Sequence, residues 1–243
     1  MSSTGPPAIL VTGGSRGIGR AICLQFGQVN WRVGVHYRER AQEAHETVAL
    51  ITKDGGNAVI CRADIRDPRQ VHVMMENFVA QCGRIDMLVC NAGVTVDRLL
   101  LRMSLHEWTA ILETNLTGTF HCLKEAGRYM LAQRRGSVVV ISSFAAHHGR
   151  PGQSAYAASK AGLLGLVKTL AQEWGPRNVR INAILPGWHK TEMSEAALRD
   201  GGRFKDHALG RPTDVQAVAR TVYHLSLLED ISGQIWNLDS RIL

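Results

Sequence analysis

Short apolar segments alternate with longer amphipathic segments along almost the whole chain. The apolar segments carry few polar residues, which is typical of strands that are covered on both faces by helices. Such alternation predicts a parallel sheet in which a helix follows each strand. We therefore expect one domain over residues 1–243, a doubly wound (Rossmann) α/β fold with a parallel sheet of about seven strands and helices on both faces.

Glycine, proline and polar clusters mark the ends of these segments. The expected strands lie at residues 8–11, 31–37, 57–64, 84–93, 136–143, 178–187 and 233–239. The expected helices lie from residue 17 onward, at 41–56 with the stop signal included, at 67–83, about 105–133, about 154–174 and 212–228. In sheets of this kind, ligands bind at the carboxyl ends of the strands, so residues just after strands are the first candidates for a site.

The segment VTGGSRGIG connects the first expected strand to the first expected helix. Gly13 allows a sharp turn, Gly17 allows the backbone to approach a pyrophosphate, and Gly19 allows close packing of helix and strand. Ser15 and Arg16 can add hydrogen-bond donors to a phosphate. A glycine motif at this strand–turn–helix position predicts a dinucleotide-binding site.

The end of the second expected strand indicates which dinucleotide binds. A protein selective for NAD usually carries Asp or Glu there for the ribose 2′-hydroxyl, whereas this chain has Tyr37. No carboxylate is expected to repel a 2′-phosphate, and Arg16 and Arg38 could bind one, which favours NADPH. The alternative for Arg38 is a solvated turn residue. Asp64, after the third strand, could accept a hydrogen bond from the adenine amine.

Tyr156 and Lys160 are four residues apart in an expected helix, so their side chains share one face. Tyrosine ordinarily has a pKa near 10. A nearby ammonium group and an oxidised nicotinamide ring both favour the phenolate, so we expect the pKa of Tyr156 to fall. The phenol could then exchange a proton at neutral pH.

Taken together, these motifs resemble the short-chain dehydrogenase/reductase family over nearly the whole chain. TGGSRGIG is similar to the cofactor loop of that family, NAG to its fourth-strand motif, and PGWHKTEM to its loop over the nicotinamide. The segments ETNLTG, ISS and YAASK resemble those that carry the four catalytic residues. Within the family, the chain is most similar to 3-oxoacyl-[acyl-carrier-protein] reductases.

The resemblance implies a role for each of four residues. Tyr156 would give its proton to a carbonyl oxygen as NADPH delivers hydride to the carbon. Lys160 would hold the nicotinamide ribose, and Ser143 would hydrogen-bond the carbonyl oxygen. Asn115 would bind a water that links Lys160 to solvent. Ser142 is the alternative to Ser143, because neighbours in a strand point in opposite directions.

The resemblance also implies further cofactor contacts. They are Ile18, Asn91, Ala92, Gly93, Pro186, Gly187 and Thr191, besides the residues already named and the catalytic Tyr156 and Lys160. Two roles stay open for Asn91: an edge of the cofactor site, or a structural tie from the fourth strand to its neighbour. Residues around 188–210 are polar and rich in glycine, which predicts a mobile lid over the substrate.

His147 and His148 could form a general base or a metal pair. No carboxylate or cysteine spacing supports a metal site, so we expect none and interpret both histidines as loop residues near the substrate mouth.

The predicted function is NADPH-dependent reduction of a 3-oxoacyl thioester, carried on acyl carrier protein, to its 3-hydroxyacyl form, as in fatty acid biosynthesis. The nearest alternative is the same hydride chemistry on acetoacetyl-CoA or another carbonyl: a sugar, a steroid or a quinone. Substrate pockets leave little sequence signature, so this alternative stays open. A non-catalytic cofactor-binding scaffold subunit is a further alternative, although the four catalytic residues are all present.

Arg134 and Arg177 close two helices that pack side by side in this topology, so they could form a basic docking patch for the acidic carrier protein. The relatives that the chain resembles carry basic residues at the matching positions. Favourable interaction with the helix dipoles is the alternative role. The resemblance also implies a homotetramer. The C-terminal segment NLDSRIL departs from a glycine pair found in many relatives, which affects the expected subunit contacts and not the chemistry.

Composition and charge narrow the classes of function and of cellular location that the chain can have. The net charge is +7, but Lys and Arg are scattered, so no nucleic-acid-binding face is expected. No apolar run is long enough to span a bilayer, and the start lacks the features of a secretory signal. The five cysteines are odd in number and lie in apolar patterns, which indicates buried thiols and a cytoplasmic location.

Overall fold

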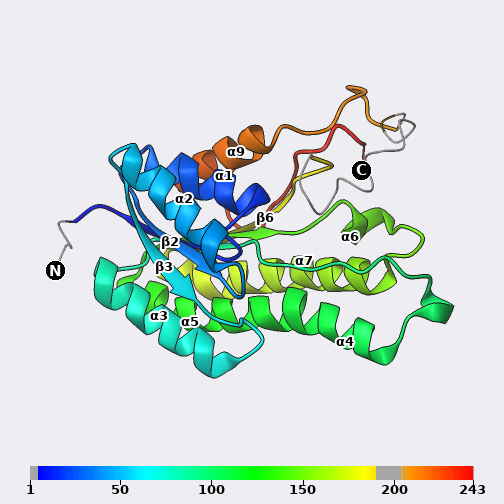
Figure 1. The fold of residues 1–243 in the computed structure, drawn as a ribbon, viewed down its shortest axis with the longest axis horizontal. Helices are drawn as coiled ribbons and strands as arrows, with labels where there is room; N and C mark the ends of the chain where they lie inside the picture. Colours follow the sequence, from blue (N-terminus) through cyan, green and yellow to red (C-terminus); the bar gives the residue numbers. More distant parts are fainter. Residues whose placement is uncertain (1–4, 190–203, 205, 243) are drawn as a thin grey trace.

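A seven-stranded parallel sheet forms the centre of the molecule (Figure 1). The structure is a computed structural model that describes residues 5–189, 204 and 206–242. The strands run in the order β3-β2-β1-β4-β5-β6-β7, and every neighbouring pair is parallel. Their bounds are β1 Ala8–Val11, β2 Arg32–Tyr37, β3 Asn57–Arg62, β4 Met87–Cys90, β5 Gly136–Ile141, β6 Val179–Leu185 and β7 Ile235–Asn237. The predicted doubly wound sheet is confirmed.

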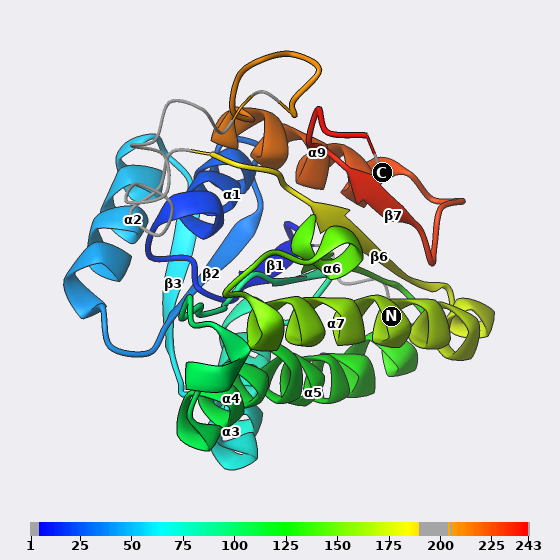
Figure 2. The same ribbon diagram turned by 90° about the vertical axis from the view of Figure 1, so that its right-hand side faces the viewer.

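Helices cover both faces of this sheet (Figures 1 and 2). One face carries α1 Gly17–Gly27, α2 Ala41–Lys53 and α9 Val215–Leu227. The other face carries α3 Pro68–Cys82, α4 Leu105–Leu112, α5 Gly118–Gln133 and α7 Ser154–Trp174. The short α6, Ala145–His148, lies between β5 and α7. Among the described residues, no helix is both long and apolar enough to cross a membrane.

The alternation of side chains along the strands divides the core into two parts. Ile9 and Val11 of β1 pack with α1 and α9, whereas Ala8 and Leu10 pack with α3 and α5, and all four are fully buried. Because both faces of each central strand are covered, the strands are apolar throughout. This rigid frame holds the carboxyl ends of the strands at one edge.

The long helix predicted for residues 105–133 is interrupted. It consists of α4, one π-helical turn, η2 (Glu113–Thr117), and α5. In η2 the Gly118 N–H donates to the Glu113 carbonyl, five residues back. Thr119 Oγ1 donates to the Asn115 carbonyl, 2.8 Å away. Such π turns occur often at functional sites, and this one contains Asn115.

The predicted strands were also too long at their carboxyl ends. The fourth ends at Cys90 and not at residue 93, and the last covers only Ile235–Asn237. The residues beyond Cys90 leave the ladder to form a loop at the carboxyl edge of the sheet, whereas Leu238, just beyond β7, still donates to the Leu185 carbonyl.

Candidate active site

A cavity of about 590 Å³ lies at the carboxyl edge of the sheet. It brings together most of the residues that the sequence singled out. They are Gly13, Ser15, Arg16, Gly17, Ile18, Arg38, Asp64, Asn91, Ala92, Gly93, Ser143, Tyr156, Lys160, Pro186 and Gly187. Gly19 and Asn115 are packed next to lining residues. Thr191 and most of the predicted lid lie outside the described residues.

The glycine loop has the backbone that its sequence predicted. Gly13 and Gly17 have φ values of +66° and +55°, in the region that favours glycine. A Cβ on Gly19 would lie 2.1 Å from the Gly13 carbonyl oxygen, so only glycine fits there. The first turn of α1 has no acidic residue and no side-chain cap, and Gly17 and Ile18 line the cavity. This helix N-terminus fits the pyrophosphate of a dinucleotide.

His36 holds the glycine loop, and sequence reasoning did not single it out. Its Nδ1 accepts a hydrogen bond from the Gly13 N–H at 2.9 Å, so its Nε2 carries the proton and donates to the Ala63 carbonyl at 3.1 Å. Burial lowers the pKa of His36 from 6.5 to about 4. The only signal in the sequence was a polar residue inside an apolar strand.

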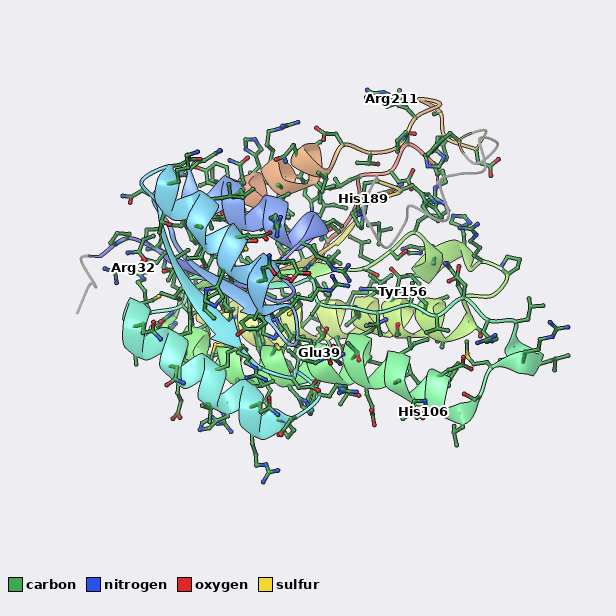
Figure 3. The ribbon with its side chains drawn as sticks, in the orientation of Figure 1. Arg32, Glu39, His106, Tyr156, His189 and Arg211 are labelled. Carbon is green, nitrogen blue, oxygen red and sulfur yellow. The ribbon has the colours of Figure 1, made fainter. Side chains whose placement is uncertain are left out.

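We expect the neutral form of His36 to make stability depend on pH. Between pH 6.5 and about 4, the unfolded chain binds a proton at His36 that the folded chain does not bind. The free energy of unfolding should therefore decrease by about 3 kcal/mol as the pH is lowered across this window. Urea unfolding measured at several pH values should show this slope in the wild type and a smaller slope in His36→Gln. The exposed His106 (Figure 3) supplies the control, since His106→Gln should keep the wild-type slope. Equal slopes for the wild type and His36→Gln would contradict the assignment.

Asn91 lies on the cavity and also ties two strands together. Its side-chain amide donates to the Thr12 and Gly13 carbonyls, at 2.9 and 3.1 Å. The Thr12 hydroxyl in turn accepts the N–H groups of Asn91 and Ala92, at 2.9 and 3.0 Å. The geometry therefore supports the structural tie, while the same residue forms part of the cavity wall.

The end of β2 is more crowded than the sequence suggested. Arg38 pairs with Glu39 at 2.8 Å, and both residues line the cavity. The turn after β2 thus also brings the Glu39 carboxylate to the cavity, which the sequence analysis did not anticipate. The Asp64 carboxylate accepts hydrogen bonds from the backbone and guanidinium of Arg66, which hold its pKa below the usual range.

The two serines after β5 have separate environments. Ser142 is buried, and its hydroxyl donates to the Lys160 carbonyl at 2.9 Å. Ser143 is hydrogen-bonded to Tyr156, and its oxygen also accepts the Ala145 N–H at 3.2 Å. Of the two, only Ser143 has its hydroxyl beside the phenol, as the sequence interpretation favoured.

The protein environment raises the pKa of Tyr156, contrary to the fall expected from sequence. Burial is the main cause, and the negative charge of Asp97 adds to it, while the hydrogen bond with Ser143 acts in the opposite direction. Lys160 is not among the groups that shift the pKa of Tyr156. The two side chains share one face of α7, as their spacing predicted, and the ammonium lies near the Tyr156 ring while it donates to the Ile141 carbonyl.

Lys160 is buried, and its Nζ lies 5.8 Å from the centre of the Tyr156 ring. The ammonium donates to the Ile141 carbonyl at 2.7 Å. Burial lowers its pKa from 10.5 to about 8. A group with this pKa can hold or release a proton near neutral pH.

Asn115 is fully buried, and its side chain forms a two-way bridge to Val94. Its Oδ1 accepts the Val94 N–H at 2.8 Å, and its Nδ2 donates to the Val94 carbonyl at 2.9 Å. The Nδ2 group also donates to Ser159 Oγ at 3.0 Å. The side chain thus fixes the loop after β4 against α7, a role that sequence reasoning missed.

Two further histidine features border the site. His148 is exposed and stacks on Phe144, with ring centroids 4.4 Å apart. Among the described residues there is no cluster of His, Cys, Asp and Glu that could hold a metal ion.

His189 lies on the loop after β6, above Tyr156 in the view of Figure 3, and lines the cavity. Its Nδ1 lies 2.9 Å from the Gly187 carbonyl.

Comparison with known proteins identifies the family. A model of the family described as short chain dehydrogenase matches residues 7–201. The chain belongs to the short-chain dehydrogenase family. It is therefore an oxidoreductase that uses a nicotinamide cofactor.

Relatives within the short-chain dehydrogenase family resemble the chain over most of its length. A 3-oxoacyl-[acyl-carrier-protein] reductase from Synechocystis sp. is 38% identical over 246 residues, which cover 100% of this chain and 99% of the relative. A protein of the same description from Staphylococcus aureus is 41% identical over 187 residues, 77% of this chain and 76% of the relative. The crystal structure of gox2181 superposes with a TM-score of 0.93 at 28% identity, covering 97% of this chain and 95% of that chain.

Proposed function

We propose that this protein reduces 3-oxoacyl thioesters to 3-hydroxyacyl thioesters with NADPH. One observation carries the proposal: Ser143, Tyr156 and Lys160 line the same cavity as the glycine loop. The substrate class is supported by relatives named as 3-oxoacyl-[acyl-carrier-protein] reductases that are 38% to 41% identical.

The residues of the chain suggest how the carbonyl would react. When bound, the reduced nicotinamide supplies the hydride. Tyr156 carries its proton at neutral pH, as an ordinary tyrosine does, and burial favours this neutral form further, so it can donate a proton to the carbonyl oxygen. Ser143 would hydrogen-bond the same oxygen as charge develops on it. Lys160 would then return a proton toward the phenolate, which its pKa of about 8 permits.

NADPH is favoured over NADH by the charge around the end of β2. Arg16 and Arg38 both line the cavity there. The side chain of Glu39 is largely exposed, at 73%, so it can turn into solvent when a phosphate binds Arg38.

A substrate panel tests the proposal. Purified protein with NADPH should oxidise the cofactor rapidly with acetoacetyl thioesters and slowly with simple ketones, sugars, steroids and quinones. A higher kcat/KM for any of the other classes would replace the thioester proposal with that substrate. No turnover with any of them would favour a non-catalytic cofactor-binding subunit.

Arg134 and Arg177 remain the proposed docking patch for an acyl carrier protein. Both are exposed, and they precede the adjacent strands β5 and β6. Tyr156, however, lies near the start of α7 and Arg177 just beyond its end, about 30 Å away at 1.5 Å per residue. A carrier docked on this patch would therefore deliver its acyl group to the cavity of another copy of the chain.

The carrier proposal predicts a selective loss. Arg134→Glu combined with Arg177→Glu should raise the KM for a carrier-linked substrate about 10-fold, because two attractive charges become repulsive. The effect should be larger at low salt, where charges are less screened. The KM for a small acetoacetyl thioester should stay within about 2-fold. An unchanged KM for the carrier-linked substrate would exclude this patch.

We propose a homotetramer in the cytoplasm. The supporting observation for assembly is a largely apolar groove between α5 and α7, with Leu116, Phe120, Leu166 and Leu170 among its lining. All five cysteines are free and buried, which suits a reducing compartment. We treat residues 1–243 as one NADP-binding domain with a substrate lid around 188–210.

A further inference from the structure

The C-terminal segment, residues 238–242, folds back over the loops that border the cavity. Leu238 N–H donates to the Leu185 carbonyl at 2.9 Å, which extends the pairing beyond β7. The carbonyl of Ser240 accepts the Ala208 N–H at 3.1 Å. The segment is thus fixed between the end of β6 and the chain that leads to α9.

Asp239 holds the turn in this segment. Its side chain is fully buried, and Oδ1 accepts the backbone N–H of Arg241 at 3.1 Å. Its Oδ2 accepts the Nε–H of Arg241 at 2.8 Å, and the guanidinium Nη2 donates to the same oxygen. His207 Nε2 lies 3.2 Å from Oδ1. A buried carboxylate with these partners fixes the guanidinium of Arg241 in one orientation.

Asp239 also contacts the wall of the cavity at Gly187. This glycine has a φ of +77° and lines the cavity. A Cβ at this position would lie 3.0 Å from Asp239 Cγ and 2.6 Å from Thr213 Oγ1. The C-terminal segment therefore packs directly against the loop after β6.

Arg241 reaches the other side of the site. Its guanidinium lies over the Phe144 ring, 3.8 Å from the centroid. Phe144 directly follows Ser143, and its carbonyl accepts the N–H groups of His147 and His148, at 3.1 and 3.3 Å. The ring of Phe144 also stacks on His148 of α6, with ring centroids 4.4 Å apart, so it joins Arg241 to α6 directly after Ser143.

We infer that Asp239 and Arg241 are positioning residues for the reaction: Asp239 orients Arg241, and the stacked guanidinium fixes Phe144 and with it the hydroxyl of Ser143. The inference rests on the proposed function for its effect on turnover. It also proposes a part in the chemistry for the unusual C-terminus, where the sequence analysis expected an effect on subunit contacts and not on the chemistry. The last strand is short, and the turn after it sends the chain back to the site.

Kinetics of Arg241→Ala on a small acetoacetyl thioester test the inference. We expect kcat to fall about 10-fold, because Ser143 acts on the charge that develops in the transition state. KM and the Kd for NADPH should stay within about 2-fold. The kcat of Arg241→Lys should fall by a similar factor, since an ammonium group can neither stack on the Phe144 ring as a plane nor donate two parallel hydrogen bonds to Asp239. The matched control is Arg220→Ala on α9, which breaks an exposed ion pair with Asp214. Its kcat, KM and Kd for NADPH should all stay at the wild-type values.

Two results separate positioning from direct substrate binding. In a Phe144→Leu background, Arg241→Ala should have little further effect on kcat, because the two residues act through one contact. Hydrogen exchange of residues 144–149 should be faster in Arg241→Ala than in the wild type, with or without substrate turnover. Additive losses in kcat, a raised KM with unchanged kcat, or unchanged exchange would each overturn the inference. If the wild type reduced no acetoacetyl thioester, the proposed function would fail, while the exchange experiment would still decide the contact.

Discussion

Tyr156→Phe should lower kcat for a 3-oxoacyl thioester by about 10² to 10⁴, the range for a lost acid–base group. The change removes one hydroxyl from a buried ring and leaves the ring packing intact. It takes away the phenol proton that the carbonyl oxygen needs, and burial, which raises the pKa of Tyr156, favours this protonated form. Steady-state kinetics with NADPH measure the loss, and cofactor fluorescence should show a nearly unchanged Kd.

A second tyrosine provides the control for this change. Tyr129 on α5 is partly buried, and burial raises its pKa as well, but it lies outside the cavity lining. Tyr129→Phe should therefore keep wild-type turnover. A Tyr156→Phe enzyme that also turns over at the wild-type rate would remove Tyr156 from the mechanism.

Arg38→Asp should raise the KM for NADPH by about 10- to 100-fold and the KM for NADH by less than about 3-fold. The change removes a charge-assisted contact to the 2′-phosphate and adds a repulsive carboxylate, and only NADPH carries that phosphate. The KM values for both cofactors, at a fixed saturating concentration of thioester, give the discrimination directly.

Glu39 offers a matched test at the same place. Glu39→Gln releases Arg38 from its 2.8 Å ion pair, so the KM for NADPH should fall or stay equal. Equal losses for NADPH and NADH in Arg38→Asp would mean that Arg38 does not read the phosphate, and the cofactor preference would then need another basis.

The sequence predicted the sheet and the location of the site because both depend on local patterns. The glycine loop is an example: the turn at Gly13 and the clash behind Gly19 follow from the backbone of a strand–turn–helix unit. Tyr156 and Lys160 were brought to one cavity by helical spacing in the same way. In each case, residues near one another in the chain determine the geometry.

What the sequence analysis missed are contacts between segments that are distant in the chain. His36 meets the glycine loop across 23 residues, and Asn115 meets Val94 across 21. The packing of Arg241 on Phe144 joins segments almost 100 residues apart, so no local pattern reveals it. The pKa of Tyr156 was misjudged for a related reason, because burial depends on the whole fold whereas the spacing to Lys160 does not.

Transfer of deuterium from the cofactor to the substrate tests the central claim most directly. Wild-type protein is given NADPH deuterated at the reactive C4 position and an acetoacetyl thioester, and the product is analysed by mass spectrometry. We predict one deuterium on C3 of a 3-hydroxyacyl thioester, with the hydroxyl proton exchanged from water. Cofactor oxidation that leaves the product unlabelled, or a thioester that is recovered unreduced, would contradict the account.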